Sequence, residues 1–116
     1  MRGQFERGLL KMRPVRLSLR QRKVVAQSIG EICKKLDWGL WAYNVRTNHV
    51  HVVVSAPISS KTVRSRLKAN ATKAIREQGC WHKTESPWAG EGSRRNLWTY
   101  RALYSAIAYV LYDQGE

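Results

Sequence analysis

The stretch NHVHVVV, residues 48–54, places two of the chain's three histidines on either side of a single valine. The apolar, β-branched run continues to Ala56 and stops at Pro57, a pattern that predicts a strand. Because side chains alternate between the two faces of a strand, His49 and His51 are expected to share one face. Two imidazoles side by side on a rigid strand can bind one metal ion. The alternative is a solvent-facing pair on a half-buried strand.

Periodicity on both sides of this strand predicts the other elements. The segment WGLWAYNVR (38–46) is rich in β-branched and aromatic residues, and the residues at 47–48 would join it to the histidine strand in a tight hairpin. The remaining expected elements are a helix over about 19–36 capped by Ser18, a helix from Ser59 or Ser60 to about Gln78, a loop over 80–96, a short strand over 97–100 and a last helix over about 101–113.

This order predicts an α+β fold, a ferredoxin-like antiparallel sheet with helices on one face. Such a sheet begins with a strand before the first helix, but GQFERGLLKMR (3–13) neither alternates nor carries β-branched residues. We therefore expect the first strand to be missing or degenerate. The chain is interpreted as one domain over residues 1–116, with an N-terminal truncation, a misassigned start or an altered sheet edge as explanations of the gap.

The charge balance indicates a polyanionic partner. The chain carries 21 Lys and Arg against 8 Asp and Glu, a formal net charge of +13. Basic residues are spread along the whole chain, which favours nucleic acid over a membrane surface. No apolar run approaches the roughly 20 residues of a spanning helix, and the N-terminus lacks a signal-peptide pattern. Cys33 and Cys80 are too few for a disulfide scaffold, so a cytoplasmic location is expected.

Basic side chains in several segments are candidate contacts for the phosphates of single-stranded DNA. Trp88 lies in the basic loop, where an indole can stack on an unpaired base, and the alternative is that it anchors the loop to the core. The candidate DNA-binding residues are Arg20, Arg22, Lys23, Arg64, Lys68, Arg94, Arg95 and Trp88.

A second candidate pair lies on the last helix. At about 100° per residue, Tyr109 falls at the edge of the apolar stripe and Asp113 follows it by one turn on the same face. Gln114 points elsewhere unless the helix end frays. A tyrosine beside a carboxylate suggests an oxygen nucleophile next to a metal ligand. The alternative is ordinary amphipathic packing of a partly buried tyrosine.

Together, NHVHVVV on a strand, the basic helix after it and the C-terminal AIAYVLYDQG resemble the HUH single-tyrosine transposases, including the REP-associated tyrosine transposases. The resemblance runs from about residue 17 to the end. It implies that His49 and His51 hold a divalent ion, Mg²⁺ or Mn²⁺, with Asp113 or alternatively Gln114 as third ligand. Tyr109 would attack a DNA phosphate and form a 5′-phosphotyrosine link. The implied partners are single-stranded DNA with a hairpin and a second copy of the chain.

Three other readings remain open from the sequence. A rolling-circle initiator or relaxase shares the chemistry but carries extra domains, for which this chain has no room. A non-catalytic basic module would bind single-stranded DNA or RNA without cleaving it. An inactive transposase relic would keep the fold but not the reaction.

Overall fold

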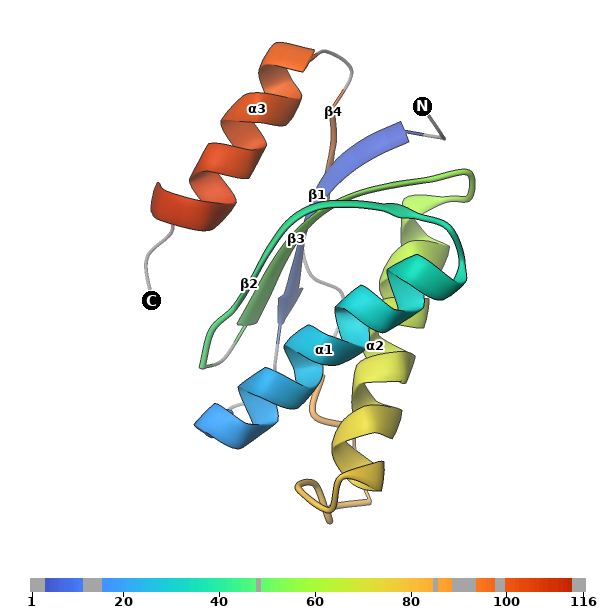
Figure 1. Ribbon diagram of the computed structural model, residues 1–116, viewed down its shortest axis with the longest axis vertical. Coiled ribbons are helices and arrows are strands. Elements are labelled where there is room, and N and C mark those ends of the chain that lie inside the picture. Colours follow the sequence, from blue (N-terminus) through green and yellow to red (C-terminus); the bar gives the residue numbers. More distant parts are fainter. Residues whose placement is uncertain are drawn as a thin grey trace.

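In the computed structural model, the backbone is described for residues 4–11, 16–47, 49–84, 86–88, 94–97 and 100–113, and side chains for 16–47, 49–84, 86–88 and 104–112. Figure 1 shows the arrangement of the helices and strands. In chain order the elements are β1 (Gln4–Lys11), α1 (Leu19–Lys35), β2 (Gly39–Val45), β3 (His49–Ala56), α2 (Ser60–Glu77), β4 (Arg94–Leu97), α3 (Tyr100–Ala108) and a π-helical turn, η1 (Tyr109–Asp113).

The four strands form one antiparallel sheet in the order β2-β3-β1-β4. The histidine strand β3 lies inside the sheet, between β2 and β1. This order, with α1 and α2 as the two connections, is the ferredoxin-like arrangement. The predicted α+β fold class is therefore confirmed.

The expectation that the first strand is missing is wrong. β1 pairs along its whole length with β3 and also with β4, so it is an inner strand of the sheet. The rule of alternating polar and apolar residues applies to strands with one face in water. Helices cover both faces of this sheet, so an inner strand need not alternate, and pairing on both edges overrides its weak β propensity.

Local signals place both long helices as predicted. The Ser18 side chain accepts the Gln21 backbone N–H at 3.1 Å, and the Gln21 side chain accepts the Ser18 N–H at 2.8 Å, which is a capping box. Ser59 caps α2 by accepting the Thr62 N–H. A serine cap is worth about 1 kcal/mol over alanine, which fixes where each helix begins.

The core has two parts, one on each face of the sheet. On one face α1 and α2 pack against Val50, Val52 and Val54 of β3. On the other face Ala106 and Val110 pack against Ala42 and Val53. The expectation that all helices share one face is therefore wrong for α3, which lies across the sheet from α1 and α2 (Figure 1). Val53 is buried on the face of β3 opposite to that of Val50, Val52 and Val54. β3 therefore supplies apolar side chains to both layers of the core.

The C-terminal elements begin earlier than predicted. The strand expected over 97–100 lies at Arg94–Leu97, and Tyr100, predicted to end that strand, is the first residue of α3. The last helix ends in the π-turn η1 rather than as a regular α-helix.

Two further observations concern the thiol of Cys33 and the length of the helices. Burial raises the pKa of the Cys33 thiol to about 11, so this core cysteine stays protonated and unreactive near neutral pH. Within the part of the chain that the structure describes, no helix is both long enough and apolar enough to cross a membrane.

Candidate active site on the tyrosine face of the sheet

His49 and His51 lie next to each other on one face of β3. Their ring centroids are 4.9 Å apart and the rings meet edge to face, at 85°. Both side chains are half-buried, whereas Val50 between them is fully buried on the opposite face. The strand holds its two imidazoles at a spacing at which both can bind one ion.

Tyr109 comes to this histidine pair from the C-terminal helix. Its ring centroid lies 5.8 Å from that of His51, with an angle of 70° between the rings. The Tyr109 side chain contacts this histidine and is still 37% exposed, so it remains accessible to solvent. The tyrosine and the histidines that the sequence singled out separately are thus brought together within a single chain.

The other described tyrosines of this helix are more exposed. Tyr104 and Tyr112 have 65% and 81% of their surface in solvent. Tyr109 lies directly before the fully buried Val110, at the edge between the apolar stripe that packs on the sheet and the solvent. The helical phase worked out from the sequence therefore places Tyr109 correctly, at the boundary of the core.

The third metal ligand is not settled by these contacts. Asp113 ends the π-turn, but its side chain lies outside the described residues, and so does Gln114. Among the side chains that the structure describes, there is no group of three or more His, Cys, Asp or Glu suited to a metal ion. A π-turn pairs residue i with i+5, so the α-helical spacing used to choose Asp113 over Gln114 does not hold here. Both assignments stay predictions.

Asn44 is a site residue that the sequence reading missed. It lies on β2 directly opposite His51 in the sheet register, and its side-chain Nδ2 donates to the Val110 carbonyl at 3.1 Å. The signal was present in the sequence, because counting back from the hairpin pairs 45 with 50 and 44 with 51. A polar residue within a strand, directly opposite a candidate ligand, marks a position on the functional face.

The candidate phosphate contacts differ widely in exposure. Lys23 and Arg20 are exposed, although the Arg20 guanidinium also donates to the Gln78 carbonyl at 2.6 Å. Arg22 and Lys68 are half-buried. Arg64 is only 7% exposed, so burial removes it from the surface where phosphates bind and corrects that assignment. The side chains of Arg94 and Arg95 lie outside the described residues.

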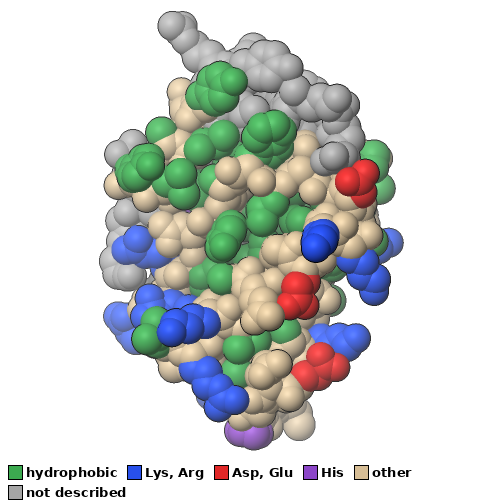
Figure 2. Space-filling model, viewed as in Figure 1, with side chains coloured by type: hydrophobic (Ala, Val, Ile, Leu, Met, Phe, Trp, Pro, Cys, Tyr) green, Lys and Arg blue, Asp and Glu red, His purple; other side chains and the backbone are tan. Residues whose placement is uncertain are grey.

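Basic side chains nevertheless dominate the surface. In Figure 2 Lys and Arg lie on both sides of the lower part of the molecule, where α1 and α2 lie, with acidic side chains among them on the right. An excess of positive charge, here a formal net charge of +13, attracts a polyanion without selecting a sequence.

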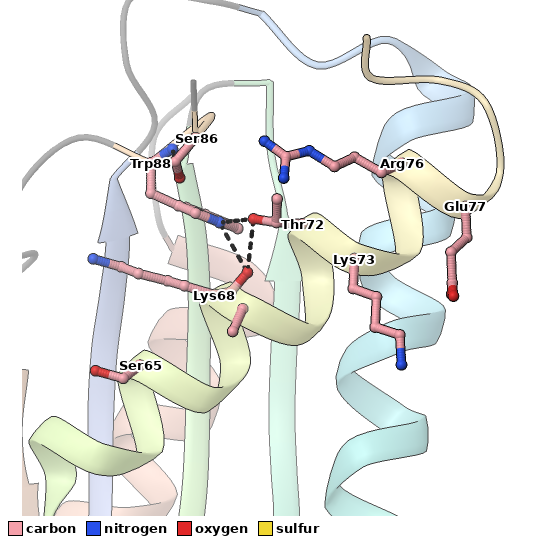
Figure 3. A pocket seen from close by; sticks show the side chains of 9 residues that line it. Ser65, Lys68, Thr72, Lys73, Arg76, Glu77, Ser86 and Trp88 are labelled. Carbon is pink, nitrogen blue, oxygen red and sulfur yellow. Dashed lines mark hydrogen bonds between the residues drawn. The ribbon is translucent and has the colours of Figure 1, made fainter. Parts of the chain in front are cut away.

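Trp88 does not fit the predicted stacking role. Its side chain is 6% exposed, and its Nε1 donates to the Lys68 carbonyl at 3.0 Å and to Thr72 Oγ1 at 2.9 Å. Figure 3 shows these bonds, which tie the loop after α2 to the middle of that helix. A buried, hydrogen-bonded indole has no free face for a base, so the alternative reading, a loop anchor, is the one that the geometry supports.

The same loop borders a groove of about 620 Å³ along α2. Its lining includes Lys68, Lys73 and Arg76, with Glu77 as the acidic member (Figure 3). Arg76 also holds the loop, since its guanidinium donates to the Thr84 carbonyl at 2.9 Å. The groove lies on α2, on the face of the sheet opposite the histidine pair.

Comparison with known proteins agrees with this geometry. A family model described as "Transposase IS200 like" matches residues 9–102. Among solved structures, a REP-associated tyrosine transposase bound to a REP hairpin superposes with a TM-score of 0.71 at 14% identity, covering 95% of this chain and 66% of that one. No curated protein matches. The family match spans most of the chain and the superposition shows the same fold, so the chain belongs to the IS200-like family of HUH single-tyrosine transposases.

Proposed function

We propose that this transposase nicks and rejoins single-stranded DNA through a covalent 5′-phosphotyrosine intermediate on Tyr109. The observation that carries the proposal is the contact of the Tyr109 ring with His51, at 5.8 Å, beside a second histidine on the same strand face. A solvent-accessible nucleophile next to a pair of potential metal ligands is an arrangement suited to metal-assisted cleavage of a phosphodiester by a tyrosine.

The bonds balance as a transesterification. The Tyr109 phenolic oxygen gives up its proton and attacks the phosphorus, the P–O bond to the 3′ oxygen breaks, and that oxygen takes up a proton and leaves as a 3′-hydroxyl. The tyrosine keeps the 5′-phosphate as an ester. Because one phosphodiester replaces another, a 3′-hydroxyl from a second strand can reverse the step and rejoin DNA without a nucleotide cofactor.

A divalent ion fits the residues present. His49 and His51 share a face with rings 4.9 Å apart, and imidazole nitrogens are common ligands of divalent transition metals. With the predicted carboxylate of Asp113, the site would offer both nitrogen and oxygen ligands. Mn²⁺ suits such a mixed site, and Mg²⁺ prefers the oxygen ligands. When bound, the ion would polarise the scissile phosphate and offset negative charge in the transition state.

The proposed substrate is single-stranded DNA that carries a hairpin. It is supported by the net charge of +13 and by the similarity of the fold to a transposase solved with a REP hairpin. The proposal includes a homodimer acting in the cytoplasm. Tyr109 reaches His51 of its own chain, so a dimer is not needed to bring these two side chains together.

Formation and mapping of the covalent adduct test the proposal. Wild-type protein with Mn²⁺ or Mg²⁺ and a hairpin-bearing oligonucleotide should form a protein–DNA adduct, which peptide mapping places on Tyr109. Tyr109→Phe should abolish the adduct, because it removes the attacking oxygen and keeps the ring that packs against His51.

The exposed neighbours supply matched controls. Tyr104→Phe and Tyr112→Phe lose the same atom at 65% and 81% exposed positions and should form the adduct normally. An adduct mapped to either of them refutes the assignment of Tyr109. Tight DNA binding with no adduct on any hairpin substrate would leave a non-catalytic binding module as the function.

A further inference from the structure

A side chain of β2 reaches the turn that carries Tyr109. Asn44 Nδ2 lies 3.1 Å from the Val110 carbonyl oxygen, and because a carbonyl only accepts, the amide nitrogen is the donor. Asn44 is half-buried and Val110 is fully buried, so water competes little for this bond. A hydrogen bond in such surroundings is stronger than one at an exposed site.

Asn44 and His51 are direct neighbours across the sheet. Residues opposite each other in antiparallel strands have Cβ atoms about 4.5–5.5 Å apart and share a face. Two successive residues of the π-turn therefore meet two adjacent positions on the sheet, since the Tyr109 ring contacts His51 and the Val110 carbonyl binds Asn44. Because the turn is attached to the sheet at two adjacent residues, both its rotation and its position are fixed.

The apolar contacts of this turn do not have that directional effect. Ala106 and Val110 press the helix onto Ala42 and Val53 through apolar contacts. Such contacts are non-directional and tolerate small rotations of the helix. A π-turn is also a rare conformation that occurs as single turns, often at functional sites. The amide of Asn44 supplies a directional bond to its backbone.

We infer that Asn44 is a positioning residue for the nucleophile. Its amide holds the π-turn in the orientation that keeps Tyr109 against the histidine pair. This inference rests on the proposed function, in which Tyr109 attacks phosphorus. The rate of attack depends on near-attack geometry, and misplacing a reacting group by about 1 Å can cost on the order of a hundredfold. Asn44 therefore acts on the rate of attack and not on DNA affinity.

Asn44→Asp is the sharpest variant, because it keeps the shape of the side chain and replaces the donor by a carboxylate oxygen that faces the carbonyl. Asn70→Asp is the matched control. Asn70 is also half-buried, and its Nδ2 donates to the Ser28 carbonyl at the same 3.1 Å, but it lies on α2. At saturating DNA, Asn44→Asp should slow adduct formation by about tenfold or more. Its DNA affinity and the adduct rate of Asn70→Asp should stay near wild type.

A spectroscopic measurement separates this inference from the proposed function. With 3-fluorotyrosine at position 109, the ¹⁹F resonance reports the surroundings of the ring without any reaction. Asn44→Asp should move it toward the value of a solvent-exposed fluorotyrosine, and Asn70→Asp should leave it unchanged. An unchanged resonance in Asn44→Asp, or an unchanged adduct rate, overturns the inference. If wild-type protein forms no adduct, the proposed function fails and the resonance still decides whether Asn44 holds the turn.

Discussion

The two histidines of β3 are half-buried, so their rings are held by packing while some of their surface stays accessible. At the scale of single residues this combination suits a ligand site better than either full burial or full exposure. An imidazole in a dry core has no access to an ion, and a fully exposed one has no fixed orientation.

Loss of either imidazole should therefore remove metal-dependent cleavage. His49→Ala and His51→Ala should each lose divalent-dependent adduct formation, measured over a Mn²⁺ titration, because one imidazole cannot replace two. Binding to single-stranded DNA, measured by fluorescence anisotropy, should stay close to wild type, since the exposed basic side chains supply it.

His82→Ala is the control for these variants. His82 lies exposed in the loop after α2 and should tolerate substitution without effect on cleavage. Full cleavage by His49→Ala in excess chelator would show that the pair is not a metal site.

At the scale of elements, the loop after α2 is held by specific bonds to that helix. The Trp88 indole of the loop donates to the Lys68 carbonyl of the helix, and the Arg76 guanidinium of the helix donates to the Thr84 carbonyl of the loop. The loop is therefore held to α2 at Thr84 and at Trp88, although its composition of Gly, Ser, Pro and charged residues predicts only irregular structure.

Replacing Trp88 should affect stability and not DNA binding. Trp88→Leu removes the ring and its two hydrogen bonds from a buried site, which should lower the free energy of unfolding by about 2–3 kcal/mol in urea denaturation. Thr72→Val removes one of these partners and keeps the indole, so its loss should be smaller. A stacking tryptophan would give the opposite pattern, a loss of DNA affinity worth about 1–3 kcal/mol with stability little changed.

At the scale of the whole molecule, the net charge of +13 on 116 residues acts on a partner at longer range than any single contact. Like charges on a small domain repel one another and destabilise it. A nucleic acid that neutralises them gains affinity from the counterions that it releases.

Affinity for single-stranded DNA should thus fall steeply with salt. The slope of log affinity against log salt is about −0.7 per phosphate contacted, so about six contacts would give roughly −4. Lys23→Gln should make this slope shallower by about 0.7, because Lys23 is exposed. The matched change at a buried position, Arg64→Met, should leave the slope of the folded protein unaltered. A slope near zero for wild type would contradict nucleic-acid binding.

The sequence by itself determined the features that depend on neighbours along the chain. The capping serines at 18 and 59 and the period-two face shared by His49 and His51 follow from local geometry, and the structure has them. The position of Tyr109 at the edge of the apolar stripe follows from helical periodicity in the same way.

Tertiary structure alone decided the features that depend on distant segments. β1 exists because β3 and β4 pair with it on both sides, and its own residues carry no strand pattern. Arg64 and Trp88 are buried because neighbouring segments cover them, which a charge count or a loop composition cannot show. The meeting of Tyr109 with His51 and the bond from Asn44 to Val110 arise only when α3 packs on the face opposite α1 and α2. Sequence periodicity fixes which way a side chain points from its own element, but the partner that it meets is fixed by packing between elements.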